Sequence, residues 1–520
     1  MLKRSNGFTI VELLIVIVVI GILSSITIVA FNGVARKAID TVVKSDGASL
    51  AKSQALYGIE RGEQYASWYS ANAAPAGFTT SLNNGNTADI VTSSDQKQYC
   101  IRIYNAKSSY GTLDAAYTVE QPTGACATLA ASSEAIAAAA GPVTSGWKAI
   151  GAMCAIRFDD KTYCWGYNPE GQLGNGTINN SGVPVPVTTT GALSGKTVKS
   201  VASHAFSTCV TASDDNAYCW GNNVKGQLGN GTTSDSTVPV AVSKAGVLSG
   251  KTIKTLSTNA YIACAVASDD KAYCWGDNFD ARFGNGTSSD SSFPVAVSVS
   301  GLLSGKTVTG ISVGNRSTCT VTSESIAYCW GNNTYGQLAN GNNITSSVPV
   351  AVSTAGALSG KTVKAVSTGN LMACAIASDN NAYCWGYNAL RQLGNGTTTD
   401  SNIPVAVSTA GVLAGKTLKS ISVGGNVVCA VASDNNAYCW GNNIYGQLGN
   451  GTTTNSAVPV AVTTSGALSG KTIKSITVGN NSVCAVASNN SGYCWGANYD
   501  GQLGNNTYTD SNVPVLVTQP

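Results

Sequence analysis

Cysteine is the residue type whose spacing in this chain most clearly implies chemistry. Fourteen of the 16 cysteines form pairs whose members lie ten residues apart, and successive pairs are 55 residues apart. Such thiols either bind a metal or form disulfides, but a zinc site is disfavoured because there is no Cys-x-x-Cys pair and only one histidine, His204. We therefore expect no metal and seven disulfides: Cys154–Cys164, Cys209–Cys219, Cys264–Cys274, Cys319–Cys329, Cys374–Cys384, Cys429–Cys439 and Cys484–Cys494.

Residues suited to catalysis or cofactor binding are scarce. His204 occurs in one repeat only and has no evident acidic partner, which disfavours a role as general base. The segment Gly191–Thr197 (GALSGKT) is similar to a phosphate-binding loop, but it has three residues rather than four before its Gly-Lys pair. We interpret it as a structural turn, because it lies between expected strands and no helix follows it. The sequence predicts a protein that is not an enzyme, with no catalytic residues and no cofactor.

The composition restricts the compartment and the partners. Only 11% of the 520 residues are charged and the formal net charge is +3, which disfavours a nucleic-acid binder that neutralises phosphates. An even number of cysteines in a chain of low charge points to an oxidising compartment. A cytosolic enzyme is therefore disfavoured, and the length allows about two to four domains.

The amino-terminal segment contains a candidate membrane helix. Leu13–Phe31 holds 19 residues without a charge, enough for a helix to cross a hydrocarbon core. Lys3 and Arg4 precede it, so the amino end is expected on the cytoplasmic side. A signal anchor or a secretory signal peptide would account for the apolar run. Neither accounts for Glu12, because an ionisable group in a membrane helix needs a partner.

The residues Gly7–Leu14 (GFTIVELL) resemble the processing site of type IV prepilins. The resemblance implies that a prepilin peptidase cleaves between Gly7 and Phe8, and that the new amino group of Phe8 is methylated. Glu12 then stands at the fifth mature position, where the family pairs it with the amino terminus of a neighbouring subunit. Because a buried carboxylate needs a cation, assembly would supply the partner that Glu12 lacks.

The rest of the first part fits the pilin pattern. Its apolar residues recur at helical spacing after the membrane segment, and strands are expected over 98–104 and 115–120. These features predict an α+β pilin-like part with a long hydrophobic helix. Cys100 and Cys126 are expected to close this part as a disulfide, and two free thiols are the alternative.

The Ala-rich stretch that follows is either a flexible tether or a short helical spacer. The expected segments are a prepilin leader over 1–7, a transmembrane and pilin-core helix over 8–31, a pilin-like globular part over 32–126, an Ala-rich linker over 127–146 and a repeat array over 147–520.

The array consists of seven repeats of 55 residues. Each repeat holds four strand candidates, which in the sixth repeat lie at 419–423, 427–432, 437–440 and 458–462. Four strands in each of seven units predict an all-β seven-bladed propeller. The units resemble the regulator of chromosome condensation repeat through the string WGNNIYGQLGNG and the Val-Pro-Val that follows it. Departures from this string are Arg282-Phe283, Ala339 and Asn506.

Two expectations concern how the propeller is held together. The tryptophans of the seven Cys-Trp-Gly motifs are expected in the core between blades. The first unit begins at Trp147–Ile150 without a preceding Val-Pro-Val strand, whereas the chain ends in the strand Val513–Val517. We therefore predict that this last strand completes the blade that begins near Trp147, which would remove exposed sheet edges.

Positions that differ between otherwise similar repeats are candidates for ligand contacts. They lie three residues before the first cysteine of each unit and in the loop before Gly-Gln-Leu, where aromatic residues and one arginine occur. Drift of exposed loops would explain this variation, and so would a rim of rigid side chains that bind a ligand. The proposed ligand rim consists of Phe206, Tyr261, Arg316, Leu371, Tyr335, Tyr445 and Tyr499.

Together these features predict a surface-exposed minor or tip type IV pilin-like subunit whose β-propeller mediates adhesion or binding of a protein or glycan. The expected partners are other pilin subunits, the prepilin peptidase, the inner or cytoplasmic membrane before assembly, and an unidentified extracellular protein or glycan, but no nucleic acid. The bacterial precursor is expected to cross the membrane once and then to reach the cell surface or an extracellular pilus. The alternatives are an exported inhibitor of an extracellular enzyme and a pseudopilin-like secretion component.

Overall fold

The computed structural model describes residues 86–92, 98–105, 113–118, 122–124 and 146–520. The chain divides into two compact units, residues 1–143 and residues 144–520. Within the described ranges, no helix is both long and apolar enough to span a membrane. The predicted leader, the core helix over 8–31, the cleavage site at Gly7 and Phe8, and the assembly residue Glu12 lie outside the described residues.

The described part of the first unit is a four-stranded antiparallel sheet. Its strands pair in chain order and are β1 (Asn86–Thr92), β2 (Gln98–Asn105), β3 (Leu113–Thr118) and β4 (Pro122–Gly124). Strands β2 and β3 coincide with the two strands predicted for this part. Cys126 lies outside the described residues, and so does its predicted disulfide with Cys100.

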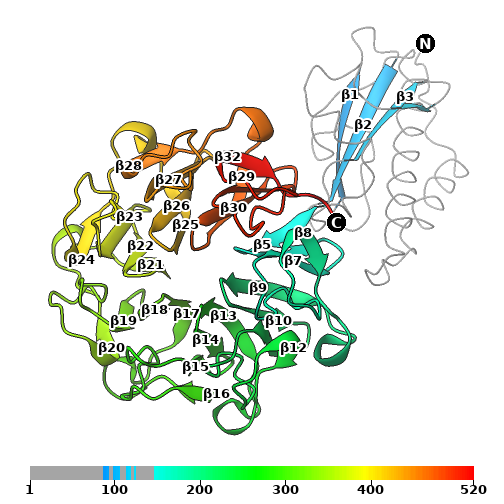
Figure 1. Cartoon of the computed structure of the whole chain (residues 1–520). Coiled ribbons are helices and arrows are strands. Elements are labelled where there is room, and N and C mark those ends of the chain that lie inside the picture. The colour runs from blue at the N-terminus through cyan, green and yellow to red at the C-terminus, as the bar shows by residue number, and fades with distance from the viewer. Residues whose placement is uncertain (1–85, 93–97, 106–112, 119–121, 125–145) are drawn as a thin grey trace, which may run out of the picture. The chain divides into compact units, whose positions relative to one another are not determined.

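The second unit is a seven-bladed propeller, which confirms the prediction from the repeat (Figure 1). Each blade is an antiparallel sheet of four consecutive strands, with the first strand nearest the centre of the ring and the fourth outermost. The strands of blades 1 to 4 are β5 (Trp147–Ile150), β6 (Cys154–Arg157), β7 (Thr162–Gly166), β8 (Ser181–Pro186); β9 (Val198–His204), β10 (Ser207–Ala212), β11 (Ala217–Gly221), β12 (Ser236–Ala241); β13 (Ile253–Asn259), β14 (Ile262–Ala267), β15 (Ala272–Gly276), β16 (Ser291–Ala296); and β17 (Val308–Val313), β18 (Ser317–Thr322), β19 (Ala327–Gly331), β20 (Ser346–Ala351). The strands of blades 5 to 7 are β21 (Val363–Thr368), β22 (Met372–Ala377), β23 (Ala382–Gly386), β24 (Ser401–Ala406); β25 (Leu418–Gly424), β26 (Val427–Ala432), β27 (Ala437–Gly441), β28 (Ser456–Ala461); and β29 (Ile473–Val478), β30 (Ser482–Ala487), β31 (Gly492–Gly496), β32 (Ser511–Leu516).

Short 3-10 helices occupy the connections from one blade to the next. They are η5 (Gly191–Leu193), η6 (Gly246–Leu248), η7 (Gly301–Leu303), η8 (Gly356–Leu358), η9 (Gly411–Leu413) and η10 (Gly466–Leu468). The lysine of the Gly-Lys-Thr segment closes this turn, since Lys196 Nζ donates to Ala192 O at 2.9 Å and lies 5.5 Å from the centre of the Tyr218 ring. These contacts show a structural turn and no phosphate-binding loop.

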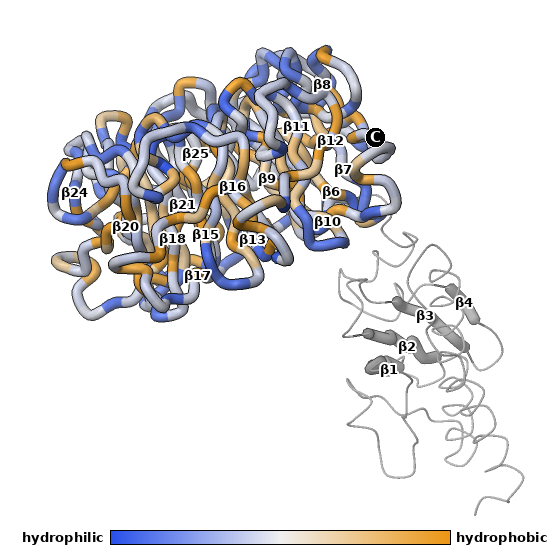
Figure 2. The backbone as a smooth tube through the Cα atoms, turned by 90° about the horizontal axis from the view of Figure 1, so that it is seen from below, coloured by the Kyte–Doolittle hydropathy of each residue, from blue (hydrophilic) through white to orange (hydrophobic). Residues whose placement is uncertain are grey.

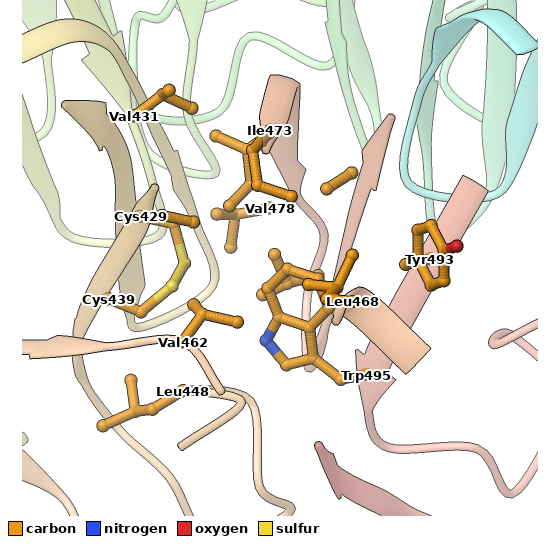
Figure 3. Close-up of a cluster of buried hydrophobic side chains, with 14 of the residues drawn as sticks. Cys429, Val431, Cys439, Leu448, Val462, Leu468, Ile473, Val478, Tyr493 and Trp495 are labelled. Carbon is orange, nitrogen blue, oxygen red and sulfur yellow. A yellow bond between two sulfur atoms is a disulfide. The ribbon is translucent and has the colours of Figure 1, made fainter. Parts of the chain in front are cut away.

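The core consists of seven apolar clusters, each shared by two neighbouring blades. Figure 2 shows hydrophobic residues mostly along the strands and hydrophilic residues in the loops at both ends of the propeller. The cluster between blades 6 and 7 contains Trp495, Tyr493, Val462, Leu468 and the cysteines of the Cys429–Cys439 disulfide, and Figure 3 shows the Trp495 ring close to Val462 and Leu468. Burial of these apolar side chains is the main force that holds neighbouring blades together.

The predicted pairs of cysteines lie directly opposite each other on the second and third strands of each blade, as Cys429 and Cys439 do on β26 and β27. The structure joins them as disulfides: Cys154–Cys164, Cys209–Cys219, Cys264–Cys274, Cys319–Cys329, Cys374–Cys384, Cys429–Cys439 and Cys484–Cys494.

The prediction that the last strand completes the first blade is wrong. Strand β32 pairs with β31 inside its own blade, and blade 1 contains its own outer strand, β8. The reason is that the first repeat has a Val-Pro-Val strand at 183–185 which follows its Cys-Trp-Gly strand. Every blade is therefore complete within one repeat, and no strand remains to be exchanged. Proline fits the outermost strand, where one edge needs no partner.

The ring closes through packing and isolated hydrogen bonds between blades 7 and 1. Trp147 and Trp165 of blade 1 share an apolar cluster with Cys484, Cys494 and Leu503 of blade 7. The Trp165 indole donates to Gln502 O at 3.0 Å, and the hydroxyl of Thr477 donates to Ile150 O at 2.8 Å. The Trp147 amide donates to Asn490 O at 2.7 Å. This junction uses the same kinds of contact as the others.

Candidate ligand-binding face

The two ends of the propeller are made from different connections. We call one end the loop face; it carries the loops between first and second strands and those between third and fourth strands, in blade 6 residues 425–426 and 442–455. We call the other end the turn face; it carries the turns between second and third strands and the connections between blades. In blade 6 the turn is residues 433–436, and the connection to blade 7 is residues 462–472. All residues of the predicted ligand rim belong to the loop face.

A buried asparagine organises each long loop of the loop face. In blade 6, Asn443 Nδ2 donates to Thr452 O at 3.0 Å and Thr454 O at 3.1 Å, and its Oδ1 accepts from the Leu448 amide at 2.8 Å. The equivalent residues are fully buried and are Asn168, Asn223, Asn278, Asn333, Asn388, Asn443 and Asn498. Because backbone groups of the loop bond to one side chain, the loop is held in a single shape.

The tryptophan of each Cys-Trp-Gly motif bonds to the long loop of the preceding blade in the ring. The Trp440 indole donates to Gln392 O at 3.0 Å and the Trp495 indole to Gln447 O at 2.9 Å, in each case across a blade boundary. The same bond occurs at all seven boundaries. The expectation that these residues form the core between blades is confirmed, because all seven indoles are fully buried.

The structure brings several of the predicted rim residues together in pairs. The rings of Phe206 and Tyr261, on neighbouring blades, have centroids 5.5 Å apart. Those of Tyr445 and Tyr499 are 6.4 Å apart. Leu371 is partly buried. The predicted rim is thus a set of separate clusters and not a continuous belt.

Two tyrosines that the sequence analysis did not select complete these clusters. Tyr167 lies 6.3 Å from Phe206, and Tyr387 lies 5.0 Å from Tyr335, measured between ring centroids. Both follow a Trp-Gly pair directly, at a position where three other repeats have asparagine. That substitution is the sequence signal that would have identified them.

The residue directly after the buried asparagine is exposed in every blade. It is apolar in several blades, and the exposed fractions are 58% for Val224, 76% for Phe279, 58% for Ile444 and 57% for Tyr499. Water-exposed apolar side chains on a rigid backbone are typical of binding surfaces, because ordering them on binding costs little entropy. Of this set, sequence analysis selected only Tyr499 for the rim.

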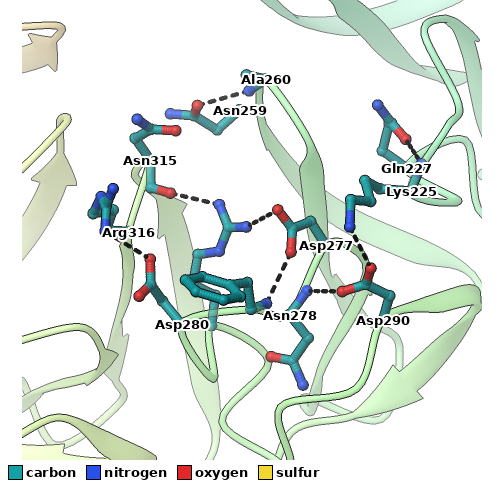
Figure 4. Close-up of polar contacts among 12 residues, drawn as sticks. Lys225, Gln227, Asn259, Ala260, Asp277, Asn278, Asp280, Asp290, Asn315 and Arg316 are labelled. Atoms are coloured by element: carbon teal, nitrogen blue, oxygen red, sulfur yellow. Dashed lines mark hydrogen bonds and ion pairs between the residues drawn. The ribbon is translucent and has the colours of Figure 1, made fainter.

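Blade 3 differs from the other blades by a cluster of charges at its boundary with blade 4 (Figure 4). Arg282 stands where most repeats have glutamine; its buried side chain forms an ion pair with Asp277 at 2.6 Å and donates to Asn315 O at 2.5 Å. Gln172 makes the equivalent bond to Ala205 O in blade 1, at 3.1 Å. Arg282 therefore keeps the bond between blades and adds an ion pair.

The exposed arginine of the predicted rim belongs to the same cluster. Arg316 lies 3.6 Å from Asp280, which also accepts a hydrogen bond from Asn332 at 3.2 Å. Phe279 lies between Asp277 and Asp280 in the loop, and its amide donates to the Asp277 carboxylate at 2.8 Å. An apolar ring is thus displayed beside fixed charges of both signs, which suits a ligand with polar groups around an apolar surface.

Carboxylates outnumber cations on the loop face. The acidic residues are Glu170, Asp235, Asp277, Asp280, Asp290, Asp400, Asp500 and Asp510, and the basic residues are Lys225, Arg282, Arg316 and Arg391. Burial raises the pKa of Asp500, and burial together with Glu170 and Asp500 raises the pKa of Tyr167. This face is therefore weakly acidic, most clearly around the boundary of blades 7 and 1.

His204 ends strand β9 beside the loop face. Burial lowers its pKa to about 4, so the ring is neutral at pH 7. Its Nδ1 is buried and has no hydrogen-bond partner among the described residues. In the part of the chain that the structure describes, no group of three or more His, Cys, Asp or Glu side chains is placed to hold a metal ion.

Comparisons with known proteins identify both parts of the chain. Residues 161–520 match the RCC1-like domain, and residues 2–28 match the prokaryotic N-terminal methylation motif. The ultraviolet-B receptor UVR8 of Arabidopsis thaliana is 28% identical over 364 residues, which are 70% of this chain and 79% of the receptor. The E3 ubiquitin-protein ligase HERC2 of Homo sapiens is 29% identical over 374 residues, 71% of this chain but only 7% of the ligase.

Solved structures show the same propeller fold. Human WBSCR16 has a TM-score of 0.61 at 20% identity and covers 69% of this chain and 94% of its own. Prp20p of Saccharomyces cerevisiae has a TM-score of 0.59 at 18% identity and covers 72% of this chain and 88% of its own.

Proposed function

Because the chain belongs to the RCC1-like domain family and carries a prokaryotic N-terminal methylation motif, we propose that it is a surface-exposed pilin-like subunit whose loop face binds an extracellular protein or glycan. The observation that carries the proposal is the display of Phe279, Tyr499 and the aromatic pairs on loops held by buried hydrogen bonds. Rigid aromatic residues are the side chains that contribute most to binding energy in protein interfaces.

The positions of the chain ends support this choice of face. The polypeptide enters the propeller at Trp147 and leaves it after β32, and both points lie on the turn face. The first strand of the propeller therefore begins, and its last strand ends, at the opposite end from the loop face. In a similar solved structure, yeast RCC1 is bound to Kap60, so that protein of the same fold has a protein partner.

The proposal includes a non-enzymatic role. Catalysis by acid and base groups requires a pair of titratable side chains with matched pKa values within reach of one substrate. The carboxylates around Phe279 are engaged with Arg282, Arg316 and Asn332. His204 is neutral at pH 7, because burial lowers its pKa to about 4. Chemical turnover of any bound ligand would contradict this part of the proposal.

The propeller is large for a subunit that packs side by side with others. A compact domain of its length has a radius of gyration of about 21 Å, which leaves little room on every subunit of a tightly packed fibre. We therefore favour a minor or tip subunit over a major one. Quantitative proteomics of sheared pili tests this: a protein found as the most abundant pilin would exclude a tip position.

Processing is tested independently by mass spectrometry of the protein recovered from cells. The expected mature chain begins at a methylated Phe8. The variant Glu12→Ala is expected to reach the membrane but to be depleted from sheared pili. A mature chain that begins at another residue would contradict pilin-type processing.

Binding is tested with the full-length protein, purified in detergent and applied to arrays of glycans, matrix proteins and β-lactamases. For a ligand that binds, Phe279→Ala is expected to weaken affinity about tenfold, as for an aromatic anchor residue. The matched control is Phe293→Ala, which removes a phenyl ring that is 46% exposed on the outer strand β16. It is expected to leave affinity within about twofold. Equal affinity in Phe279→Ala, Tyr499→Ala and the wild type would exclude the loop face as the site.

A further inference from the structure

The turn face carries a ring of lysines around the centre of the propeller. The second residue of each innermost strand lies at this end, and it is lysine in six of the seven blades: Lys148, Lys199, Lys254, Lys364, Lys419 and Lys474. Thr309 takes this place in blade 4. Each of the six lysines donates to the third residue of the turn between the second and third strands of its own blade. The identity of this acceptor residue differs between the blades.

In blades 1 to 3 the acceptor is a carboxylate. Lys148 lies 3.0 Å from Asp160, Lys199 lies 2.5 Å from Asp215, and Lys254 forms an ion pair with Asp270. In blades 5 to 7 the acceptor is a neutral amide: Lys364, Lys419 and Lys474 donate to Asn380, Asn435 and Asn490 at 2.6, 2.5 and 2.5 Å. The geometry is the same in both halves of the ring, but the positive charge is neutralised in only one of them.

A second lysine position shows the same loss of carboxylates towards blade 7. Lys251, in the connection before blade 3, lies 3.2 Å from Asp269, and Lys416, before blade 6, lies 3.9 Å from Asp434. Before blade 7 the lysine is Lys471, which donates only to the carbonyl groups of Ala467 and Ser469, and the residue equivalent to Asp434 is Asn489. Blades 5 and 6 keep a carboxylate at this second position, Asp379 and Asp434, so blade 7 is the blade whose turn has no carboxylate at either position.

A pocket of about 420 Å³ lies at the boundary of blades 6 and 7, in the half of the ring where the lysines donate to amides. Two ring lysines line it, together with hydroxyl and amide groups: Lys419, Lys474, Ser420, Thr472, Ser488 and Asn435. No carboxylate lines the pocket. Its polar groups are able to donate hydrogen bonds to a ligand, and the two ammonium groups are held in place by Asn435 and Asn490.

We propose that this half of the turn face binds the sulfate or phosphate esters of an acidic polysaccharide, with one ester group in the pocket between blades 6 and 7. An ester oxyanion presents several acceptor oxygens and no donor, which matches two ammonium groups surrounded by hydroxyls. A polymer fits because Lys364, Lys419 and Lys474 repeat from blade to blade, so successive charged groups meet equivalent sites. This site is separate from the loop face and does not depend on the function proposed for that face.

The blades themselves supply the variants that test the proposal. Asn435→Asp combined with Asn490→Asp copies the pattern of blades 2 and 3 into blades 6 and 7. Asp215 and Asp270 occupy the equivalent positions with φ of 57° and 60°, close to the 61° and 63° of Asn435 and Asn490, so the backbone accepts either residue. A matched control adds two negative charges to the loop face, through Asn180→Asp and Asn455→Asp. These two positions are aspartate in four other blades, at Asp235, Asp290, Asp400 and Asp510.

The measurement is the affinity of the full-length protein in detergent for heparin and for a phosphomannan, with neutral dextran as the reference. The wild type is expected to bind at least one of the two acidic polymers and not dextran. The Asn435→Asp, Asn490→Asp variant is expected to bind the acidic polymer at least about tenfold more weakly. The two new carboxylates neutralise Lys419 and Lys474, and the loss of a hydrogen bond to a charged group lowers the binding free energy by more than the loss of a neutral one. The loop-face control is expected to stay within about threefold of the wild type, because its charges lie at the opposite end.

The two polymers distinguish the source of the oxyanion: preference for heparin indicates sulfate esters, and preference for the phosphomannan indicates phosphate esters. Equal weakening in the two double variants would show a net-charge effect and overturn the proposal. Failure of the wild type to bind either polymer would overturn it as well, and so would tighter binding of single-stranded DNA than of both polysaccharides.

Discussion

The loop face and the turn face are opposite ends of the same seven repeats, but different residues vary on each. On the loop face the buried asparagine and the tryptophan bond recur in every blade, and the exposed side chains such as Phe279 and Tyr499 differ. On the turn face the exposed lysines recur, and the acceptor opposite them changes from aspartate to asparagine around the ring. The loop face thus varies in the side chains that it exposes, and the turn face varies in whether a recurring lysine meets a carboxylate, while the strands of the blades stay the same.

The largest expected effect on stability comes from a comparison of a buried residue that holds a loop of the loop face with its exposed neighbour. Asn443→Ala removes the three hydrogen bonds that this side chain makes to backbone groups of its loop and leaves the Leu448 amide without its acceptor, so we expect a loss of about 4 kcal/mol in the free energy of unfolding. The neighbouring substitution Ile444→Ala is expected to cost less than about 0.5 kcal/mol, because this side chain is exposed. Thermal and denaturant unfolding of the two variants measures the difference. Similar losses in both would show that the asparagine does not organise the loop.

A second prediction concerns the one ion pair of the loop face that has replaced a neutral pair. In blade 2, Gln227 donates to Asn222 at 2.5 Å, and Arg282 and Asp277 occupy the same positions in blade 3. Asp277→Asn is expected to cost about 3 kcal/mol, because it leaves the buried guanidinium without its carboxylate. Adding Arg282→Gln restores the blade 2 pattern and is expected to recover most of this loss. If the double variant is no more stable than the single one, the two residues are not coupled.

The third prediction uses the single histidine, which lies beside the loop face. The folded protein holds His204 neutral down to about pH 4, whereas the unfolded chain binds a proton below about pH 6.5. Acidification from pH 7 to pH 5 therefore favours the unfolded state, and we expect the free energy of unfolding to fall by about 2 kcal/mol. In His204→Gln the decrease of the free energy of unfolding between pH 7 and pH 5 is expected to disappear. Only the destabilisation below about pH 4, where carboxylates become protonated, is expected to remain. An unchanged slope between pH 7 and pH 5 would contradict burial of a neutral ring.

The smallest effect is expected on the turn face. In the Lys199–Asp215 pair the two side chains are 49% and 50% exposed, so solvent screens their attraction. Asp215→Asn is expected to change the free energy of unfolding by less than about 0.5 kcal/mol. Charge on this face is therefore free to vary without cost to the fold, which is what the comparison of blades 1–3 with blades 5–7 implies. A loss as large as that of Asp277→Asn would refute this reading of the turn face.

The architecture of the blades was accessible from sequence because its contacts are local. Each cysteine finds its partner ten residues away in a hairpin, and each strand pairs with the next strand along the chain. Strand exchange between the ends was predicted wrongly although its signal lies in the sequence: the Val-Pro-Val strand at 183–185 follows the first Cys-Trp-Gly motif and completes blade 1. The contacts that close the ring could not be read from the sequence, because they join residues more than 300 positions apart, such as Trp165 and Gln502.

The candidate binding site was also predictable only in part from the sequence. Aromatic positions of the rim were visible as departures from the repeat, but Tyr167 and Tyr387 were overlooked because each occupies an otherwise polar position. Their role became evident only from the rings that they contact, Phe206 and Tyr335. The lysine ring was not recognised at all, since its members are 55 residues apart or nearly so and each looks like an ordinary surface residue.

The order of residues along the chain is sufficient for the amino-terminal methylation motif, the number of blades and the partners of the propeller cysteines, because each depends on adjacent residues or on one hairpin. The folded ring was needed to show that Phe206 meets Tyr261 and that Lys419 and Lys474 line one pocket. Residues at equivalent positions of neighbouring blades are related by the rotation of one blade onto the next. Packing of the apolar clusters sets that rotation, and it therefore decides which surface residues come together.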